Sequence, residues 1–193
     1  MALSGKTLLS RLAENWVYGG VLAAPIPLIL LPFLDISAPG QGVVLALVVY
    51  MLHQYEEHDD DRFRRFVNVL FGPARRGLTS LDVMLINVIG VWALLLATLV
   101  LTERVAPGWA AIAACLLAVN GLAHVGQGLA LRRYNPGLMT AVVLFLPLAA
   151  ILFSRIAGVA SVAQHLASAG LIVALHAAIL IVARHPVLPR IVP

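Results

Sequence analysis

The sequence predicts an all-α protein, a polytopic membrane bundle of about six transmembrane helices that forms a single domain over residues 1–193. Three observations predict this fold. Of the 193 residues, 61% are hydrophobic and 11% are charged, whereas soluble domains carry about a quarter charged residues. The apolar residues form runs close to the roughly 20 residues that a helix needs to cross the hydrocarbon layer. Lysine and arginine gather in alternate connections between these runs, as in membrane proteins of fixed orientation.

The expected spans lie between turn signals, near residues 16–34, 41–57, 82–102, 108–131, 137–154 and 158–183. Proline and glycine mark the connections, at Pro39-Gly40, Gly72-Pro73, Pro107-Gly108 and Pro136-Gly137. The stretch 134–137 (YNPG) predicts a tight turn between the fourth and fifth spans, because Pro136 fixes its own φ angle and Gly137 permits a positive one. A side chain at Gly137 should therefore strain the backbone, and we expect it to leave the candidate ligands untouched.

The basic residues predict that both termini lie in the cytoplasm. With this orientation the outer loops hold only Arg104 and Arg155, and the inner segments hold the other eleven of the 13 basic residues. Cytoplasmic connections of membrane proteins carry such an excess. The first residues lack the shape of a signal peptide, so we expect a retained N-terminus and a protein integral to the cytoplasmic (inner) membrane. The eleven are Lys6, Arg11, Arg62, Arg64, Arg65, Arg75, Arg76, Arg132, Arg133, Arg184 and Arg190.

Residues 60–80 predict a short helix that lies on the cytoplasmic membrane surface. Apolar residues recur there at helical spacing and arginines take the other side, a pattern that suits a headgroup region with anionic lipids. A solvated basic loop is the alternative interpretation. The apolar residues are Phe63, Phe66, Val67, Leu70 and Phe71, and the arginines are Arg62, Arg64 and Arg65.

The stretch 52–61 (LHQYEEHDDD) places ionisable residues at the end of the second apolar run. On a helix His53 lies three residues before Glu56 and four before Glu57, so all three share a face, whereas His58 points well away from it. An imidazole and two carboxylates are ligands that zinc, manganese or iron accept. The same groups could transfer protons without a metal. A polar helix end wetted by headgroups is the structural alternative.

Further polar residues lie inside other spans, at a similar expected depth. Asn120, His124 and Gln127 form a stripe on one side of the fourth span, and Asn87 and His176 lie in the third and sixth. The three span histidines should sit roughly 7–12 Å above the inner boundary, at 1.5 Å of rise per residue. Because such groups usually face the bundle interior, the shared layer predicts one functional site. Hydrogen bonds between helices are the alternative role for the two asparagines.

The stretch 53–57 (HQYEE) resembles the signature of the HXXEE family of bacterial membrane proteins. Asn120 with His124, and the stretch 134–138 (YNPGL), are similar to that family's other marks, so the resemblance covers roughly residues 45–150. The resemblance implies that one set of residues belongs together, namely His53, Glu56, Glu57, Asn120 and His124. It brings no established activity and no substrate.

Three functional hypotheses follow for this set of residues. The first is a metal-dependent membrane enzyme with hydrolase or oxidoreductase chemistry, whose lipid-like or amphiphilic substrate enters from the cytoplasmic leaflet. The second is a metal-independent acid–base isomerase of a hydrophobic molecule, and the third is a small transporter or ion-binding protein. Membrane lipids are expected partners, and nucleic acid is not. In the first hypothesis the metal is zinc, iron or manganese, and its ligands are His53, Glu57 and His124, with His176 completing the set. Glu56 is a further ligand or the general base, and Glu57 is also a catalytic candidate. Three polar residues orient the ligands, namely Asn87, Asn120 and Gln127.

Overall fold

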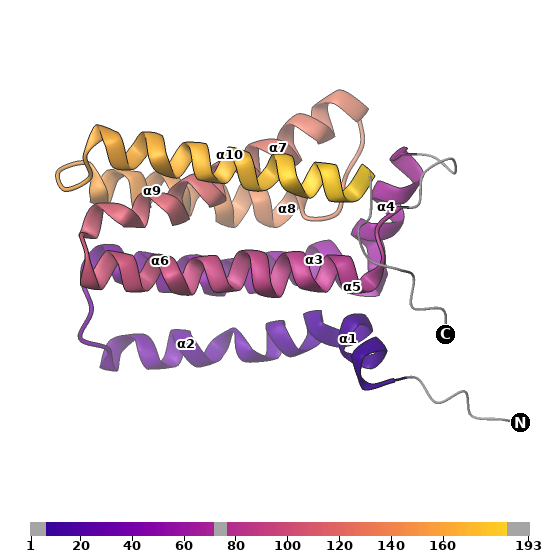
Figure 1. The fold of residues 1–193 in the computed structure, drawn as a ribbon, viewed down its shortest axis with the longest axis horizontal. Coiled ribbons are helices and arrows are strands. Elements are labelled where there is room, and N and C mark those ends of the chain that lie inside the picture. The colour runs from indigo at the N-terminus through magenta and orange to yellow at the C-terminus, as the bar shows by residue number, and fades with distance from the viewer. Residues whose placement is uncertain (1–6, 72–76, 185–193) are drawn as a thin grey trace, which may run out of the picture.

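The computed structural model describes residues 7–71 and 77–184, and all regular elements in these two ranges are helices. The helices form long rods that run back and forth along one axis (Figure 1). The start of α1, the end of α10 and the short helix α4 all lie at one end of the bundle. Lys6, Arg75, Arg76, Arg190 and the expected turn at Gly72-Pro73 lie outside the described residues.

The first two rods precede the polar motif. The first comprises α1 (Leu8–Ala23), α2 (Pro25–Leu30) and the 3₁₀ turn η1 (Leu31–Phe33). Its prolines interrupt the helical hydrogen bonding, since proline has no backbone N–H. The second rod is α3 (Ala38–His58), where Ser37 caps the first turn through its bond from the Gly40 N–H, 3.1 Å long. Glu103 accepts from the Ser37 hydroxyl at 2.6 Å and so ties this end of α3 to the neighbouring rod.

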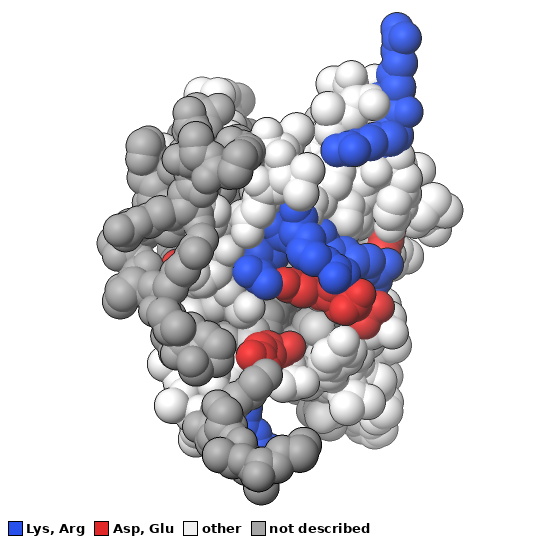
Figure 2. Space-filling view, turned by 90° about the vertical axis from the view of Figure 1, so that its right-hand side faces the viewer, with Lys and Arg blue, Asp and Glu red and all other residues white. Residues whose placement is uncertain are grey.

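At the other end of α3 the chain turns through η2 (Asp59–Asp61) into α4 (Arg62–Phe71). Asp60 and Asp61 both adopt positive φ angles there. Three aspartate–arginine pairs join η2 to α4, and they place basic and acidic side chains side by side on this end of the molecule (Figure 2). The apolar side of α4 packs against the end of the bundle, where Val67 is buried with Leu78 and Val83. The predicted helix is therefore present, and its position on a membrane surface stays a prediction.

Four more rods complete the bundle. They are α5 (Ser80–Leu85) with η3 (Ile86–Trp92) and α6 (Ala93–Arg104), then η4 (Pro107–Ala110) with α7 (Ala111–Leu131), then α8 (Leu138–Thr140) with η5 (Ala141–Phe145) and α9 (Leu146–Ile156), and last α10 (Val162–Arg184). The segments η3 and η5 are π-helical, a conformation that is frequent at functional sites. The small residues of α7 are buried in the core and allow the close contacts that α7 makes with α9 and α10.

Five helices in the described ranges are long and apolar enough to cross a membrane: Leu8–Phe33, Ser80–Arg104, Pro107–Leu131, Leu138–Ile156 and Val162–Ile181. They correspond to five of the six expected spans, and the first begins eight residues earlier than expected. The sixth expectation, 41–57, falls on α3, whose 21 residues include the polar motif and which is not among these five helices. Because α3 packs against α1, α6 and α9, the motif lies between helices rather than on the bundle's surface.

Candidate metal centre

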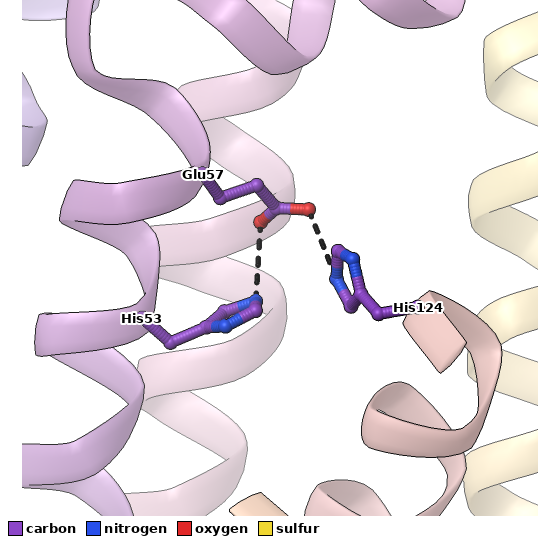
Figure 3. Close-up of side chains that lie close together, drawn as sticks. All are labelled: His53, Glu57 and His124. Carbon is purple, nitrogen blue, oxygen red and sulfur yellow. Dashed lines mark ion pairs between the residues drawn. The ribbon is translucent and has the colours of Figure 1, made fainter. Parts of the chain in front are cut away.

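Three of the predicted ligands converge between α3 and α7 (Figure 3). His53 and Glu57 are one helical turn apart on α3, and His124 faces them from α7. His53 Nε2 lies 3.6 Å from Glu57 Oε2, and His124 Nε2 lies 3.4 Å from Glu57 Oε1. All three side chains are buried, and one ligand atom from each lies within 4.8 Å of the others. Glu56 and His176 are not part of this group.

The separations suit a metal ion better than a direct ion pair. A charge-assisted N–H···O bond is about 2.7–2.9 Å long, so both contacts to Glu57 are too long for one. Ligands held about 2.0–2.1 Å from a tetrahedral metal stand about 3.3–3.4 Å apart, which is close to the distance between each histidine nitrogen and the Glu57 oxygen that faces it. His53 Nε2 is also a buried nitrogen without a hydrogen-bond partner. The cluster could therefore hold a metal ion.

The other ring nitrogen of each histidine is engaged. His53 Nδ1 lies 2.8 Å from Thr140 Oγ1, and His124 Nδ1 lies 2.7 Å from Asn135 Oδ1. The Asn135 amide donates to the His124 carbonyl at 2.9 Å, which leaves its oxygen to accept from the imidazole. Each ring therefore has an oxygen partner at Nδ1 and turns its Nε2 atom toward Glu57. Metal-binding histidines are oriented in this way by partners at their second nitrogen.

Both of these partners come from one short segment, residues 134–140, which we call the 134–140 turn. Gly137 adopts a φ of 94° within it, as the sequence predicts. The expectation that a side chain at Gly137 would leave the ligands untouched is wrong. A Cβ there would lie 2.7 Å from His53 Cε1 and 2.8 Å from His124 Cε1, because the turn packs its backbone directly on both rings.

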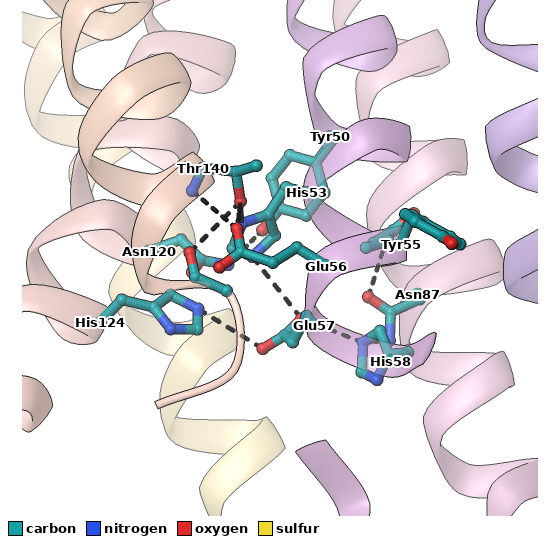
Figure 4. Close-up of polar contacts among 12 residues, drawn as sticks. Tyr50, His53, Tyr55, Glu56, Glu57, His58, Asn87, Asn120, His124 and Thr140 are labelled. Atoms are coloured by element: carbon teal, nitrogen blue, oxygen red, sulfur yellow. Dashed lines mark hydrogen bonds and ion pairs between the residues drawn. The ribbon is translucent and has the colours of Figure 1, made fainter. Parts of the chain in front are cut away.

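Glu56 faces the same turn rather than the cluster (Figure 4). Its Oε1 accepts from the Tyr134 hydroxyl at 2.7 Å and the Met139 N–H at 3.0 Å. Its Oε2 accepts from the Thr140 N–H at 2.7 Å and the Thr140 hydroxyl at 2.5 Å. Burial and the bond to Glu56 raise the pKa of Tyr134 to about 12. The two glutamates of the motif thus point to different partners, although they are adjacent in sequence.

His58 lies against the cluster, contrary to the sequence-based expectation that it points away. Its Nε2 is 3.0 Å from Glu57 Oε2. The physical reason is that α3 ends there: His58 has a φ of −112°, and its ring folds back beside the neighbouring carboxylate. Behind it Asn87 Nδ2 lies 3.3 Å from His58 Nε2, and Gln54 donates to the Asn87 carbonyl oxygen at 2.8 Å. Asn87 therefore connects η3 to the cluster through His58.

The remaining predicted residues line a cavity beside the cluster. This cavity has a volume of about 300 Å³ and lies between α3, α7, α10 and the α5–η3 segment. Glu57 and His124 form part of its wall, together with Asn120, Gln127 and His176. His176 Nδ1 contacts the carbonyl of Ile172 on its own helix, and the Asn120 amide donates to the Tyr50 hydroxyl. Most of the other lining residues are apolar, among them valines, leucines and isoleucines.

A second cavity of about 420 Å³ lies at the end of the bundle, between α1, η2 and the start of α5. Its lining is mainly polar and includes Asn15, Asp60 and Arg64. His58 and Val83 line both cavities. The cluster is therefore bordered by a mainly apolar cavity on one side and separated from a polar cavity by the His58 side chain.

Asn135 and Thr140 are the site residues that sequence reasoning missed. Asn135 belongs to a stretch that was interpreted as a turn and as a mark of the family, but not as part of the site, and Thr140 follows it without any distinguishing pattern. The available signal was the short connection between the helix that carries His124 and the next one, since it keeps Asn135 within eleven residues of that histidine. The partner of His53 could not be found this way, because it depends on how α3 packs against the turn.

Comparison with known proteins identifies a family. The family described as "Protein of unknown function with HXXEE motif" matches residues 44–152. This range contains the three converging ligands, Glu56 and the whole 134–140 turn. No curated protein and no solved structure matches the chain.

Proposed function

The chain belongs to the family of proteins of unknown function with an HXXEE motif, and we propose that it is a metal-dependent integral membrane enzyme. In this proposal His53, Glu57 and His124 bind one divalent ion, and the adjoining cavity binds a lipid-like or amphiphilic substrate. The reaction is a hydrolysis or an oxidation–reduction.

The observation that carries this proposal is the arrangement of the two imidazoles. Both Nδ1 atoms are bonded to oxygen acceptors, and both Nε2 atoms face one buried carboxylate at separations of 3.4 and 3.6 Å. A buried nitrogen lone pair without a donor is unfavourable by about 1–3 kcal/mol. A cation between the three groups removes this deficit and neutralises the carboxylate.

A bound divalent ion would supply Lewis acidity at this position and activate water or dioxygen. Two histidines and one carboxylate serve zinc hydrolases and non-haem iron oxygenases alike. The protein's own groups bind the substrate. The leucines and isoleucines of the cavity contact its apolar part and exclude water from it. Asn120 and Gln127, on the same side of α7 as His124, bind its polar group.

We also propose the orientation in the membrane. Six rods cross the bilayer, α3 included, with both termini in the cytoplasm, and the cluster lies in the cytoplasmic leaflet of the inner membrane. The excess of basic residues in alternate connections supports this orientation. The common end of α1, α4 and α10 agrees with it (Figure 1). A substrate dissolved in the bilayer then reaches the cavity from the side.

Elemental analysis of the purified protein, prepared without chelators, tests the proposal. We expect one zinc, iron or manganese ion per chain, and the metal found distinguishes hydrolysis from oxygen chemistry. His53→Ala and His124→Ala should each lose the metal. His165→Ala is the matched control, because His165 contacts Ser161 and Phe153 at the other end of the molecule, and it should keep the metal. Wild-type protein without metal would refute the proposal.

A specific contact favours acid–base isomerisation as the second candidate. His58 Nε2 lies at true hydrogen-bonding distance from Glu57, 3.0 Å, so the carboxylate is shared by three imidazoles. Such a group can accept and return a proton on a hydrophobic molecule without a metal. Metal-free protein that isomerises a hydrophobic substrate, and loses this activity in Glu57→Gln, would establish this candidate instead.

A further inference from the structure

We infer that Glu56 is a positioning residue: through the 134–140 turn it fixes the tautomer and the place of both metal-binding histidines. The inference rests on the proposed function only in naming the histidines as metal ligands. It departs from the sequence-based alternatives, in which Glu56 binds the metal or acts as the general base. It also explains why the motif contains two glutamates, since each has its own task.

Glu56 is bonded to a single segment of the chain. The four groups that donate hydrogen bonds to the Glu56 carboxylate belong to the 134–140 turn, and two of them are the backbone N–H groups of Met139 and Thr140. These amides lie in the first turn of the helix that continues through η5 into α9, where N–H groups lack partners within the helix. Gly137, the residue before this helix, has no side chain with which to cap it. Glu56 therefore caps from α3 a helix that begins about 80 residues later in the chain, and so fixes the turn against α3.

The Thr140 hydroxyl has a single proton to donate. It donates this proton to Glu56 Oε2 at 2.5 Å, so toward His53 it acts as the acceptor. His53 must then carry its proton on Nδ1, at 2.8 Å from Thr140 Oγ1. The Nε2 lone pair is thereby left free to face the cluster. The negative charge of Glu56 thus sets the tautomer of His53 through one hydroxyl group.

The same turn also holds His124. Asn135 follows Tyr134, whose hydroxyl is bonded to Glu56, and it is fully buried. Its amide contacts His124 at both the ring nitrogen and the backbone carbonyl. When Glu56 keeps the turn in place, it therefore keeps the acceptor of His124 in place as well.

A carboxylate is required at this position because an amide offers only one acceptor oxygen. In Glu56→Gln the side-chain nitrogen faces one pair of donors and can accept from neither. If the nitrogen faces Thr140, the hydroxyl loses its acceptor on residue 56. The Gly137 carbonyl, 3.3 Å away, is a more distant acceptor than His53 Nδ1 at 2.8 Å, so the hydroxyl turns toward His53 as a donor. His53 would then move its proton to Nε2, the atom that should bind the metal.

Two variants and one control test the inference. Glu56→Gln removes the carboxylate, and Thr140→Val removes only the hydroxyl between Glu56 and His53. Glu103→Gln is the matched control, because Glu103 also accepts hydrogen bonds at a helix start, from the Ser37 N–H and hydroxyl. It lies at the far end of α3 from the cluster. Two measurements are made: zinc affinity by competition with a chromophoric chelator, and the histidine tautomers of metal-free protein by ¹⁵N NMR after ¹⁵N-histidine labelling.

We expect Glu56→Gln to weaken zinc binding by about 10–100-fold, the usual effect of changing a group that orients a metal ligand. Thr140→Val should act on His53 in the same direction. The double variant should bind zinc no more weakly than Glu56→Gln alone, since the effect of the lost hydroxyl on His53 is already part of the effect of Glu56→Gln. In metal-free Glu56→Gln and in Thr140→Val, His53 should change from the Nδ1–H to the Nε2–H tautomer. Glu103→Gln should change thermal stability but neither zinc affinity nor tautomer.

Unchanged zinc affinity and unchanged tautomers in Glu56→Gln would overturn the inference. So would an equal loss of zinc affinity in Glu103→Gln, because the effect would then be one of general stability. If Glu56→Gln does not fold, Thr140→Val decides: a His53 tautomer that stays on Nδ1 refutes the inference. Wild-type protein that binds neither zinc, iron nor manganese would refute the proposed function alone, since the tautomers are read in metal-free protein.

Discussion

Gly137→Ala tests how closely the 134–140 turn covers the candidate metal centre. The added Cβ would lie 2.7 Å from His53 Cε1, whereas ordinary contact begins at 3.4 Å. The ring or the turn must therefore move by about 0.7 Å, the difference of these two distances, which exceeds the about 0.5 Å within which a functional group must be held. His124 meets the same Cβ at 2.8 Å and must move by a similar amount.

The stability cost has two parts. An alanine at the positive φ of position 137 costs about 1–2 kcal/mol. Overpacking against the two rings costs about 1–3 kcal/mol more. We therefore expect Gly137→Ala to lower the free energy of unfolding by about 2–5 kcal/mol. Zinc affinity should fall by at least about tenfold, as it does when the groups around a metal ligand are disturbed.

Gly126→Ala is the control for this experiment. Gly126 lies on α7 two residues after His124, and a Cβ there meets nothing within 4 Å. Alanine in place of a helical glycine should raise stability by up to about 1 kcal/mol and leave zinc affinity unchanged. Unfolding in mixed micelles and chelator competition measure the two quantities. A Gly137→Ala protein with wild-type stability and wild-type affinity would refute the placement of the turn on the histidine rings.

Three further predictions concern the surroundings of the site. Gln54→Leu should lower the free energy of unfolding by about 1–3 kcal/mol for each polar group that it leaves unpaired. One such group is the Trp92 indole N–H, which donates a hydrogen bond to the Gln54 side-chain oxygen at 2.7 Å. An unchanged unfolding midpoint would contradict this prediction. In a variant without the native cysteine, a cysteine at Arg132 should resist an impermeant thiol reagent added outside and one at Gly158 should react, and the reverse pattern would overturn the orientation. Because the pKa of Tyr134 is raised from 10 to about 12 in the folded state, its protonated hydroxyl stabilises the fold fully below pH 10, and this contribution is lost as the pH rises to about 12. The free energy of unfolding should therefore fall more in wild type than in Tyr134→Phe over this interval. Parallel pH profiles of the two proteins would refute the bond to Glu56.

The sequence was sufficient to predict the helical class and the core of the candidate site. His53 and Glu57 are four residues apart, and helical geometry alone brings them to one face. His124 was found because polar groups in apolar spans tend to face the bundle interior. Five of the predicted spans agree with apolar helices for a related reason, since the hydrophobic length of a span is set by the bilayer.

The parts that could not be predicted depend on packing between distant segments. Glu56 shares the face of His53 by helical spacing, yet its carboxylate is taken by Tyr134, Met139 and Thr140 from a turn about 80 residues away. Helical spacing also misplaced His58, because it assumes that the helix continues, and α3 ends at that residue. Local periodicity describes where a side chain leaves its helix, and the partners that meet it there are set by tertiary structure.

The two cavities that meet at His58 have a consequence for how reactants could be delivered. One is bordered mainly by apolar side chains of α7, α10 and η3, and the other by the polar end of the bundle. A compound that partitions into oil and a small polar molecule that stays in water could each approach Glu57 from its own phase. The protein would then bring together reactants from the membrane and from water, with the His58 side chain lying between the two cavities that receive them.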